Sequence, residues 1–184
     1  MLKKSSKRIS KNEHYLKIAE AVSCRGTCLC VAGGAVIVKE DQIVATGYIG
    51  APRKTKDCLE LGFCIRRKKN IQSGTGYEMC RSVHAEMNAI INSARAGVSL
   101  LGGDLYLFFG KKEVDGKISP VKAFPCLLCK KMIINSGLKK FYGNDERGDL
   151  KEYSVDDWVR EWKKAEDITL DKDRYRVNYK KTKK

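Results

Sequence analysis

Two short segments that place metal-binding side chains at predicted helix starts constrain this chain more than any other feature. His84-Ala85-Glu86 begins a stretch with helical spacing of apolar residues, and Pro125-Cys126-Leu127-Leu128-Cys129 begins a second one. Cys126 and Cys129 are three residues apart, so on a first helical turn both sulfurs lie on one side and can bind one ion. The positive end of a helix lowers thiol pKa and favours the thiolates that zinc requires. We therefore expect a zinc site between two helix N-termini, with His84 as the third ligand.

The spacing of these residues also indicates a catalytic metal. Three protein ligands leave the fourth position of zinc open, which is typical of a catalytic site and not of a closed structural one. His84 and Glu86 do not share a face of a regular helix, so both reach the ion only if it lies off the helix end. H-x-E followed by P-C-x-x-C is the signature of zinc deaminases. On that signature we expect zinc-bound hydroxide to attack C4 of cytosine while Glu86 shuttles protons to N3 and to the departing ammonia.

Apolar periodicity elsewhere predicts strands alternating with helices. This alternation is typical of a three-layer α/β domain with helices on both faces of one sheet. Residues 49–83 have no sustained period and form too long a stretch to stay unorganised in a compact domain, which favours a metal there. Asp115-Gly116 predicts a protruding hairpin, and Trp158 and Trp162 are expected to pack in the core or an oligomer contact. The expected strands are 35–38, 42–48, 104–109 and 138–142, the expected helices are 13–23, 84–96, 126–135 and 155–165, and a weak final strand is expected near 168–170 or 175–177.

Length and charge bound the domain organisation and the partners. The 184 residues fit one domain, which we place at 13–178, with a basic disordered segment at 1–12, an inserted hairpin at 110–122 and a basic tail at 179–184. The net charge of +15 favours acidic partners such as nucleotides or nucleic acid, but the basic runs, including Arg66–Lys69, are interpreted as solvated.

The absence of targeting features and the number of cysteines point to one compartment. No apolar run resembles a signal peptide or approaches a membrane span, so we expect a cytoplasmic protein without a membrane partner. Eight cysteines in a reducing compartment favour metal binding over disulfides.

From about Arg25 to Tyr142 the chain resembles the deoxycytidylate deaminase family. The resemblance implies the cytidine-deaminase fold, a mixed five-stranded sheet between helices, and the conversion of dCMP to dUMP. It also implies a homo-oligomer, often a hexamer, and backbone atoms around Ala85 and Pro125 that read the cytosine edge. Beyond the zinc residues it rests on Thr27-Cys28 ahead of Gly34-Ala35, Gly47-Tyr48-Ile49-Gly50-Ala51-Pro52, His84-Ala85-Glu86-Met87-Asn88-Ala89-Ile90 and Ser136-Gly137-Leu138-Lys139.

Some members of this family bind a second, structural zinc, and four cysteines here resemble that subgroup. The expected ligands are Cys28, Cys58, Cys64 and Cys80. A closed four-thiolate site would organise the 49–83 stretch. Cys24 or Cys30 could replace Cys28, and the alternative is a set of buried free thiols.

The chain departs from the family in two places. Ile49 stands where the family has an asparagine that contacts the nucleotide sugar, so that contact is lost unless another group replaces it. The 110–122 insertion is basic and is expected near the active-site mouth as a lid, an oligomer contact, a nucleic-acid arm or an inert loop. We expect Arg53 to hold the phosphate, with Lys54 beside it.

Two alternative functions follow from these features. One is a deaminase that acts on cytosine or adenine in RNA or single-stranded DNA, which the positive charge and Ile49 favour. The other is a catalytically inactive zinc module used for assembly, against which the presence of Glu86 argues.

Overall fold

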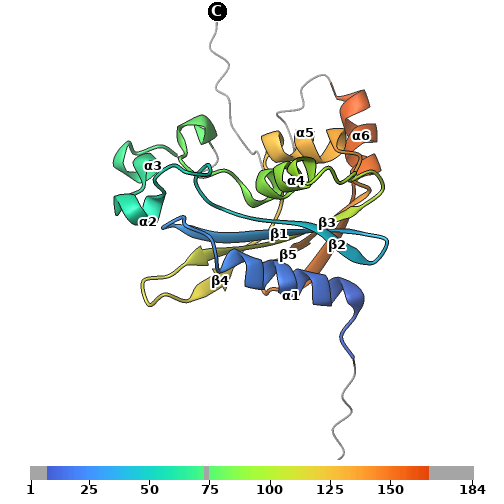
Figure 1. Cartoon of the computed structure of the whole chain (residues 1–184), viewed down its shortest axis with the longest axis horizontal. Helices are drawn as coiled ribbons and strands as arrows, with labels where there is room; N and C mark the ends of the chain where they lie inside the picture. Colours follow the sequence, from blue (N-terminus) through green and yellow to red (C-terminus); the bar gives the residue numbers. More distant parts are fainter. Residues whose placement is uncertain (1–7, 73–74, 166–184) are drawn as a thin grey trace, which may run out of the picture.

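The computed structural model describes residues 8–72 and 75–165, which form one mixed sheet covered by helices on both faces (Figure 1). The strand order is β2-β1-β3-β5-β6, and β4 pairs with β3 beside this path. Among the strands of the described residues, only the β3–β5 pair is parallel. The strands are β1 (Val31–Lys39), β2 (Gln42–Tyr48), β3 (Asp104–Lys112), β4 (Ile118–Pro120), β5 (Lys140–Asn144) and β6 (Leu150–Ser154).

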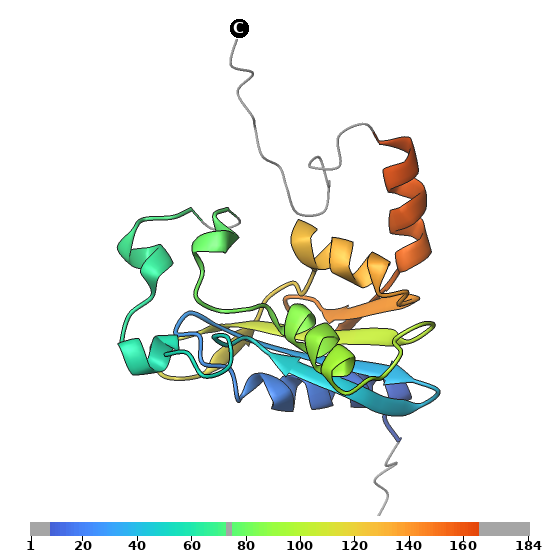
Figure 2. The same cartoon turned by 45° about the horizontal axis from the view of Figure 1, so that its top comes forward.

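Helix α1 covers one face of the sheet, and α4, α5 and α6 lie on the other (Figures 1 and 2). The alternation of side chains along β1 fits this arrangement. Val36 packs in the core cluster that contains residues of α1, whereas Ala35 and Ile37 pack in the cluster that contains residues of α4, α5 and α6. The main helices are α1 (Lys11–Ser23), α4 (Ala85–Arg95), α5 (Leu127–Asn135) and α6 (Val155–Lys164). The three-layer architecture expected from the sequence is confirmed.

Two glycines let the helices approach the sheet closely. A Cβ at Gly34 would lie 2.1 Å from the carbonyl oxygen of Ala19 on α1. On the opposite face, a Cβ at Gly47 would lie 2.3 Å from the backbone nitrogen of Ala89 on α4. Neither helix could keep its position against a side chain there.

Side-chain amides fasten α4 to β2, which is an edge strand. Asn88 Nδ2 donates to the carbonyl oxygen of Tyr48 at 2.8 Å, and Asn92 Nδ2 donates to that of Thr46 at 2.7 Å. The two asparagines are four residues apart, so they lie on the same side of the helix.

The stretch 49–83 is organised by short helices and not by periodic elements. These are α2 (Cys58–Leu61), α3 (Ile65–Lys68) and the 3₁₀ helix η1 (Tyr77–Met79). Asp57 caps α2 by accepting hydrogen bonds from the backbone nitrogens of Leu59 and Glu60, and Gly62 ends it at φ 71°.

Several boundaries differ from those expected. Helix α1 begins at Lys11 because Ser10 and Glu13 form a capping box, so the helix includes two residues assigned to the N-terminal segment. The predicted hairpin is present, with β4 antiparallel to the end of β3. The main path of the sheet has the expected five strands, and β4 of the hairpin is a sixth strand beside it. Strand β6 was not predicted at its position because its charged residues hide the strand pattern.

The weak final strand expected near 168–170 or 175–177 and the tail at 179–184 lie outside the described residues. None of the helices in the part of the chain that the structure describes could span a lipid bilayer.

Candidate active site

Two helix starts bring His84, Cys126 and Cys129 together. His84 is the N-cap residue of α4 and Cys126 that of α5, so both lie just off a helix end. His84 Nδ1 lies 3.4 Å from the sulfur of Cys126 and 3.4 Å from that of Cys129. A tetrahedral zinc ion separates such nitrogen and sulfur ligands by about 3.5 Å. The three residues therefore fit a zinc ion.

The segments that precede each ligand are held by the sheet. Gly50 and Val83 form an isolated bridge, with backbone hydrogen bonds of 3.3 and 2.8 Å, which fixes the chain immediately before His84. The buried side chain of Asn144 accepts from Phe109 N and donates to the carbonyl oxygens of Phe109 and Val121. This amide ties the end of β3 to the segment that leads to Cys126.

Glu86 lies in the first turn of α4 and is 5% exposed. It lines the same cavity as His84 and Cys126. A buried carboxylate at a helix N-terminus is stabilised by the helix dipole, and its electrostatic interactions are strong because water is excluded. Its position suits proton transfer beside the three ligands.

The two zinc-binding thiols are electrostatically coupled. The hydrogen bond between Cys126 and Cys129, together with interactions with His84, lowers the pKa of Cys126 to about 4 against the opposing effect of burial. The same hydrogen bond, then burial and the Glu86 carboxylate, raise the pKa of Cys129 well above its ordinary value. Without metal, the pair therefore consists of one thiolate and one thiol.

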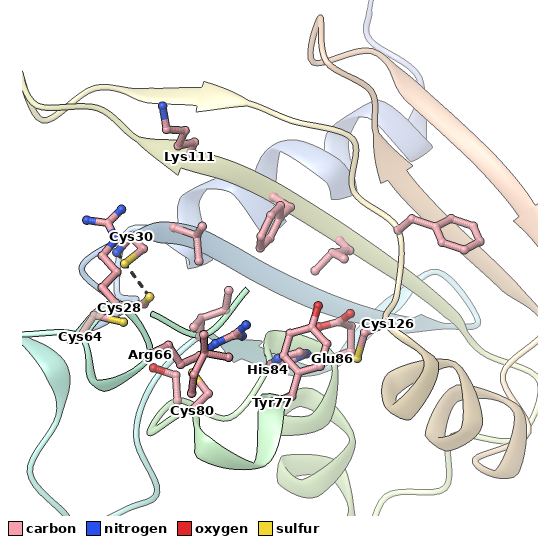
Figure 3. Close-up of a pocket in the computed structure, with 18 residues that line it drawn as sticks. Cys28, Cys30, Cys64, Arg66, Tyr77, Cys80, His84, Glu86, Lys111 and Cys126 are labelled. Carbon is pink, nitrogen blue, oxygen red and sulfur yellow. Dashed lines mark hydrogen bonds between the residues drawn. The ribbon is translucent and has the colours of Figure 1, made fainter. Parts of the chain in front are cut away.

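A cavity of about 430 Å³ extends from this triad. Figure 3 shows His84, Glu86, Cys126 and Tyr77 at one end, Cys28, Cys30 and Cys64 at the other, and Arg66 with Cys80 between them. Apolar side chains, including Ile49, Leu107 and Phe109, complete the wall.

Of the four residues expected to bind substrate, one lines the cavity and three do not. Ile49 is buried and lines the cavity. Ala85 and Pro125 are buried beside the ligands but do not line it. Arg53 does not line the cavity either, and its guanidinium donates to Oδ1 of Asn92 at 2.7 Å.

The four cysteines expected to bind a second zinc lie near one another. Cys28, Cys64 and Cys80 line the cavity, and Cys58 is buried with its sulfur 4.0 Å from Ser82 Oγ. Burial raises the pKa of Cys58, whereas its hydrogen bond with Ser82 lowers it. Electrostatic interaction with Cys28, Cys64 and Cys80 raises the pKa further, which indicates that these three residues lie nearby.

Of the two spare cysteines, only Cys30 belongs to this cluster. Its backbone nitrogen donates to the sulfur of Cys28 at 3.4 Å. Cys24 is exposed at the end of α1, where its thiol lies 3.7 Å from the carbonyl oxygen of Glu20. Among the described residues, only His84, Cys126 and Cys129 bring three possible ligand atoms within 4.8 Å of one another.

Three lysines of the hairpin form ion pairs or hydrogen bonds within the chain. Lys111 pairs with Glu113 at 3.3 Å and Lys117 pairs with Asp115 at 3.2 Å. Lys112 Nζ donates to the carbonyl oxygen of Cys28 at 2.8 Å, so the hairpin is also attached to the cysteine-bearing loop. These contacts reduce the positive charge that the hairpin offers to a partner.

Sequence reasoning missed three residues around the site. Arg66 belongs to a run interpreted as solvated, yet it is half-buried and lines the cavity. Tyr77 packs edge-on against His84, with 5.0 Å between ring centroids. Lys130 is 1% exposed and lies over the rings of Trp158 and Trp162, at 4.9 and 5.3 Å. The predicted packing of the two tryptophans gave the only available signal for Lys130.

Comparisons with known proteins agree with this geometry. The family described as the cytidine and deoxycytidylate deaminase zinc-binding region matches residues 9–143. The deoxycytidylate deaminase of Mycobacterium phage D29 is 32% identical over 134 residues, which cover 70% of this chain and 90% of that protein. The ComE operon protein 2 of Bacillus subtilis is 30% identical over 135 residues, which cover 73% of this chain and 59% of that protein.

A solved structure is similar over most of the chain. The apo crystal structure of dCMP deaminase from the cyanophage S-TIM5 has a TM-score of 0.52 and 27% identity, and the match covers 76% of this chain and 86% of that one. The same enzyme in complex with dCMP and dUMP also has a TM-score of 0.52. Some cellular relatives are longer, and the chain matches only 36% of the deoxycytidylate deaminase of Schizosaccharomyces pombe.

Proposed function

Since the chain belongs to the cytidine and deoxycytidylate deaminase zinc-binding family, we propose that it removes the exocyclic amine of a cytosine nucleotide by hydrolysis, with dCMP the favoured substrate. The observation that carries this proposal is the His84, Cys126 and Cys129 triad beside the buried Glu86, with His84, Cys126 and Glu86 lining one cavity. The phage relatives named deoxycytidylate deaminase support the choice of substrate.

In the proposed mechanism, His84, Cys126 and Cys129 would hold the zinc ion, which would supply an activated water at neutral pH for attack on C4 of the pyrimidine. Glu86 accepts the proton that this water loses and delivers it to N3 of the pyrimidine. The remaining hydroxyl proton then passes through Glu86 to the exocyclic nitrogen, the C4–N bond breaks, and ammonia leaves as the C4 carbonyl forms. The products are the uracil nucleotide and ammonia.

Ammonia release from a panel of substrates tests the proposal. The panel contains dCMP, dCTP, deoxycytidine and single-stranded oligonucleotides, and dCMP is expected to be deaminated fastest. Glu86→Gln should lower kcat by about 10²- to 10⁴-fold, because a general acid–base group is lost while the zinc ligands remain. Zinc content measured on the same preparation is the control.

The panel also discriminates between the competing functions. Deamination of an oligonucleotide without turnover of dCMP would favour the nucleic-acid alternative. A zinc-loaded protein that releases no ammonia from any substrate would favour the assembly module.

We also propose a second, structural zinc bound by Cys28, Cys58, Cys64 and Cys80. Sulfur atoms around one zinc ion lie about 3.8 Å apart, so the 49–83 stretch and the segment between α1 and β1 that carries Cys28 would draw together around the ion. Elemental analysis is expected to give two zinc ions per chain, and Cys58→Ser should reduce this to one while the catalytic zinc remains. One zinc ion per wild-type chain would contradict the second site.

The expected homo-oligomer, a hexamer by resemblance, stays a proposal. Light scattering coupled to gel filtration would measure its mass.

A further inference from the structure

Arg66 on α3 lines the cavity that His84 and Cys126 of the triad also line. Its Nη2 atom donates to the carbonyl oxygens of Gln72 and Thr75, at 2.8 and 2.6 Å. The guanidinium carbon lies 5.0 Å from the ring centroid of Tyr77, and that ring lies 5.0 Å from the ring of His84. Arg66 is therefore fixed one aromatic side chain away from a zinc ligand.

The guanidinium keeps hydrogen-bonding capacity in this position. It carries five N–H groups, of which Nη2 supplies two. Within residues 8–72 and 75–165, its Nη1 and Nε atoms make no hydrogen bond and the side chain forms no ion pair. Three N–H donors and a full positive charge thus remain for a ligand in the cavity, held in place by contacts that a ligand would not have to break.

The cavity offers a bound nucleotide a path from the triad to Arg66. With its pyrimidine beside His84 and Glu86, a nucleotide can extend its sugar and phosphate along the wall toward the other end, and Arg66 lies between the two ends (Figure 3). Arg67 lines the cavity next to it and adds a second positive charge. Arg53, the arginine singled out by the sequence, is instead bonded to Asn92 away from the cavity.

From this geometry we infer that Arg66 binds the 5′-phosphate of the substrate and makes the enzyme select nucleotides over nucleosides. The inference rests on the proposed function, because it needs the base at the zinc triad. Charge-assisted, planar recognition of phosphate is the chemistry for which a guanidinium is best suited.

The test compares dCMP with deoxycytidine, which lacks only the phosphate. Arg66→Ala should lower kcat/KM for dCMP by about 10- to 100-fold, mainly through KM, and change kcat/KM for deoxycytidine by less than about threefold. Arg66→Lys, which keeps the charge, should recover part of the loss. Arg95→Ala removes an exposed arginine at the end of α4 and is the matched control. Its kcat/KM for dCMP and its kcat/KM for deoxycytidine are both expected to stay at wild-type values.

Several outcomes would overturn the inference. An equal loss for both substrates in Arg66→Ala would mean that Arg66 only supports the loop that carries Tyr77. A phosphate-dependent loss in Arg53→Ala but not in Arg66→Ala would assign the phosphate to Arg53. Equal turnover of dCMP and deoxycytidine by the wild type would show that the enzyme does not select for the phosphate. This result would contradict the inference but not the proposed deamination of cytosine.

Product binding separates this inference from the proposed function. Calorimetry with dUMP and deoxyuridine does not require turnover, so it tests Arg66 even if no substrate releases ammonia. Wild-type protein should bind dUMP about 10- to 100-fold more tightly than Arg66→Ala does, and deoxyuridine equally. Equal binding of dUMP by both proteins would contradict the phosphate contact.

Discussion

At the scale of single residues, the zinc triad couples metal binding to protonation. The hydrogen bond that couples the two thiols lowers the pKa of Cys126 and raises that of Cys129, so the pair holds about one proton at neutral pH. Zinc binds thiolates, so it has to displace this proton.

We therefore expect the triad to release about one proton per zinc ion at pH 7, and its zinc affinity to fall about tenfold for each pH unit below that. Competition with a chelator between pH 6 and 8 measures the affinity. Cys126→Ser lacks a triad ligand, so the zinc that it still binds reports on the second metal site. This variant is the control that separates the two sites. A zinc affinity that is constant over this range would refute the assigned protonation states.

The His84, Cys126 and Cys129 cluster could be predicted from the sequence because the spacing of its residues carries chemical information. Two cysteines three residues apart at a helix start place both sulfurs on one side, where they can bind one ion. Arg66 could not be predicted, because local sequence does not distinguish a solvated arginine in a basic run from one held by the carbonyl oxygens of Gln72 and Thr75. That distinction depends on how the 49–83 stretch folds.

At the scale of elements, the site depends on how closely α4 lies against β2. Gly47→Ala would place a methyl group 2.3 Å from the backbone of Ala89 and would push the helix away from the strand. Since His84 caps this helix, we expect both a loss of about 1 to 3 kcal/mol of unfolding free energy and weaker zinc binding.

Gly34→Ala is the matched control for this prediction, because it makes an equally close contact with α1, which carries no zinc ligand. It should destabilise the protein by a similar amount and leave zinc affinity unchanged. Chemical denaturation and chelator competition measure the two quantities. Equal effects of both substitutions on zinc affinity would show that the spacing between α4 and β2 does not control the metal site.

The elements that the sequence predicted well are those with a buried face. The 42–48 strand matches β2 exactly at both ends, and the 126–135 helix differs from α5 only in that Cys126 caps it. The missed strand β6 is short, lies at the edge and exposes Lys151 and Glu152, so pairing with β5 and not hydrophobic alternation defines it.

At the scale of the whole molecule, the net charge of +15 should attract an anionic substrate from a distance. Raising the salt concentration from 0.05 to 0.5 M screens this field, so KM for dCMP is expected to rise about two- to tenfold. Deoxycytidine carries no charge, and its KM should change little. A KM for dCMP that is independent of salt would show that the net charge does not contribute to substrate binding.

The two asparagine amides that fasten α4 to β2 also affect how copies of the chain can associate. An edge strand normally offers its free carbonyl groups to a strand from another molecule. Here the carbonyl oxygens of Thr46 and Tyr48 already accept hydrogen bonds from Asn92 and Asn88, and an incoming strand would have to displace both side chains. A continuous sheet that crosses from one copy to the next along β2 is therefore not expected.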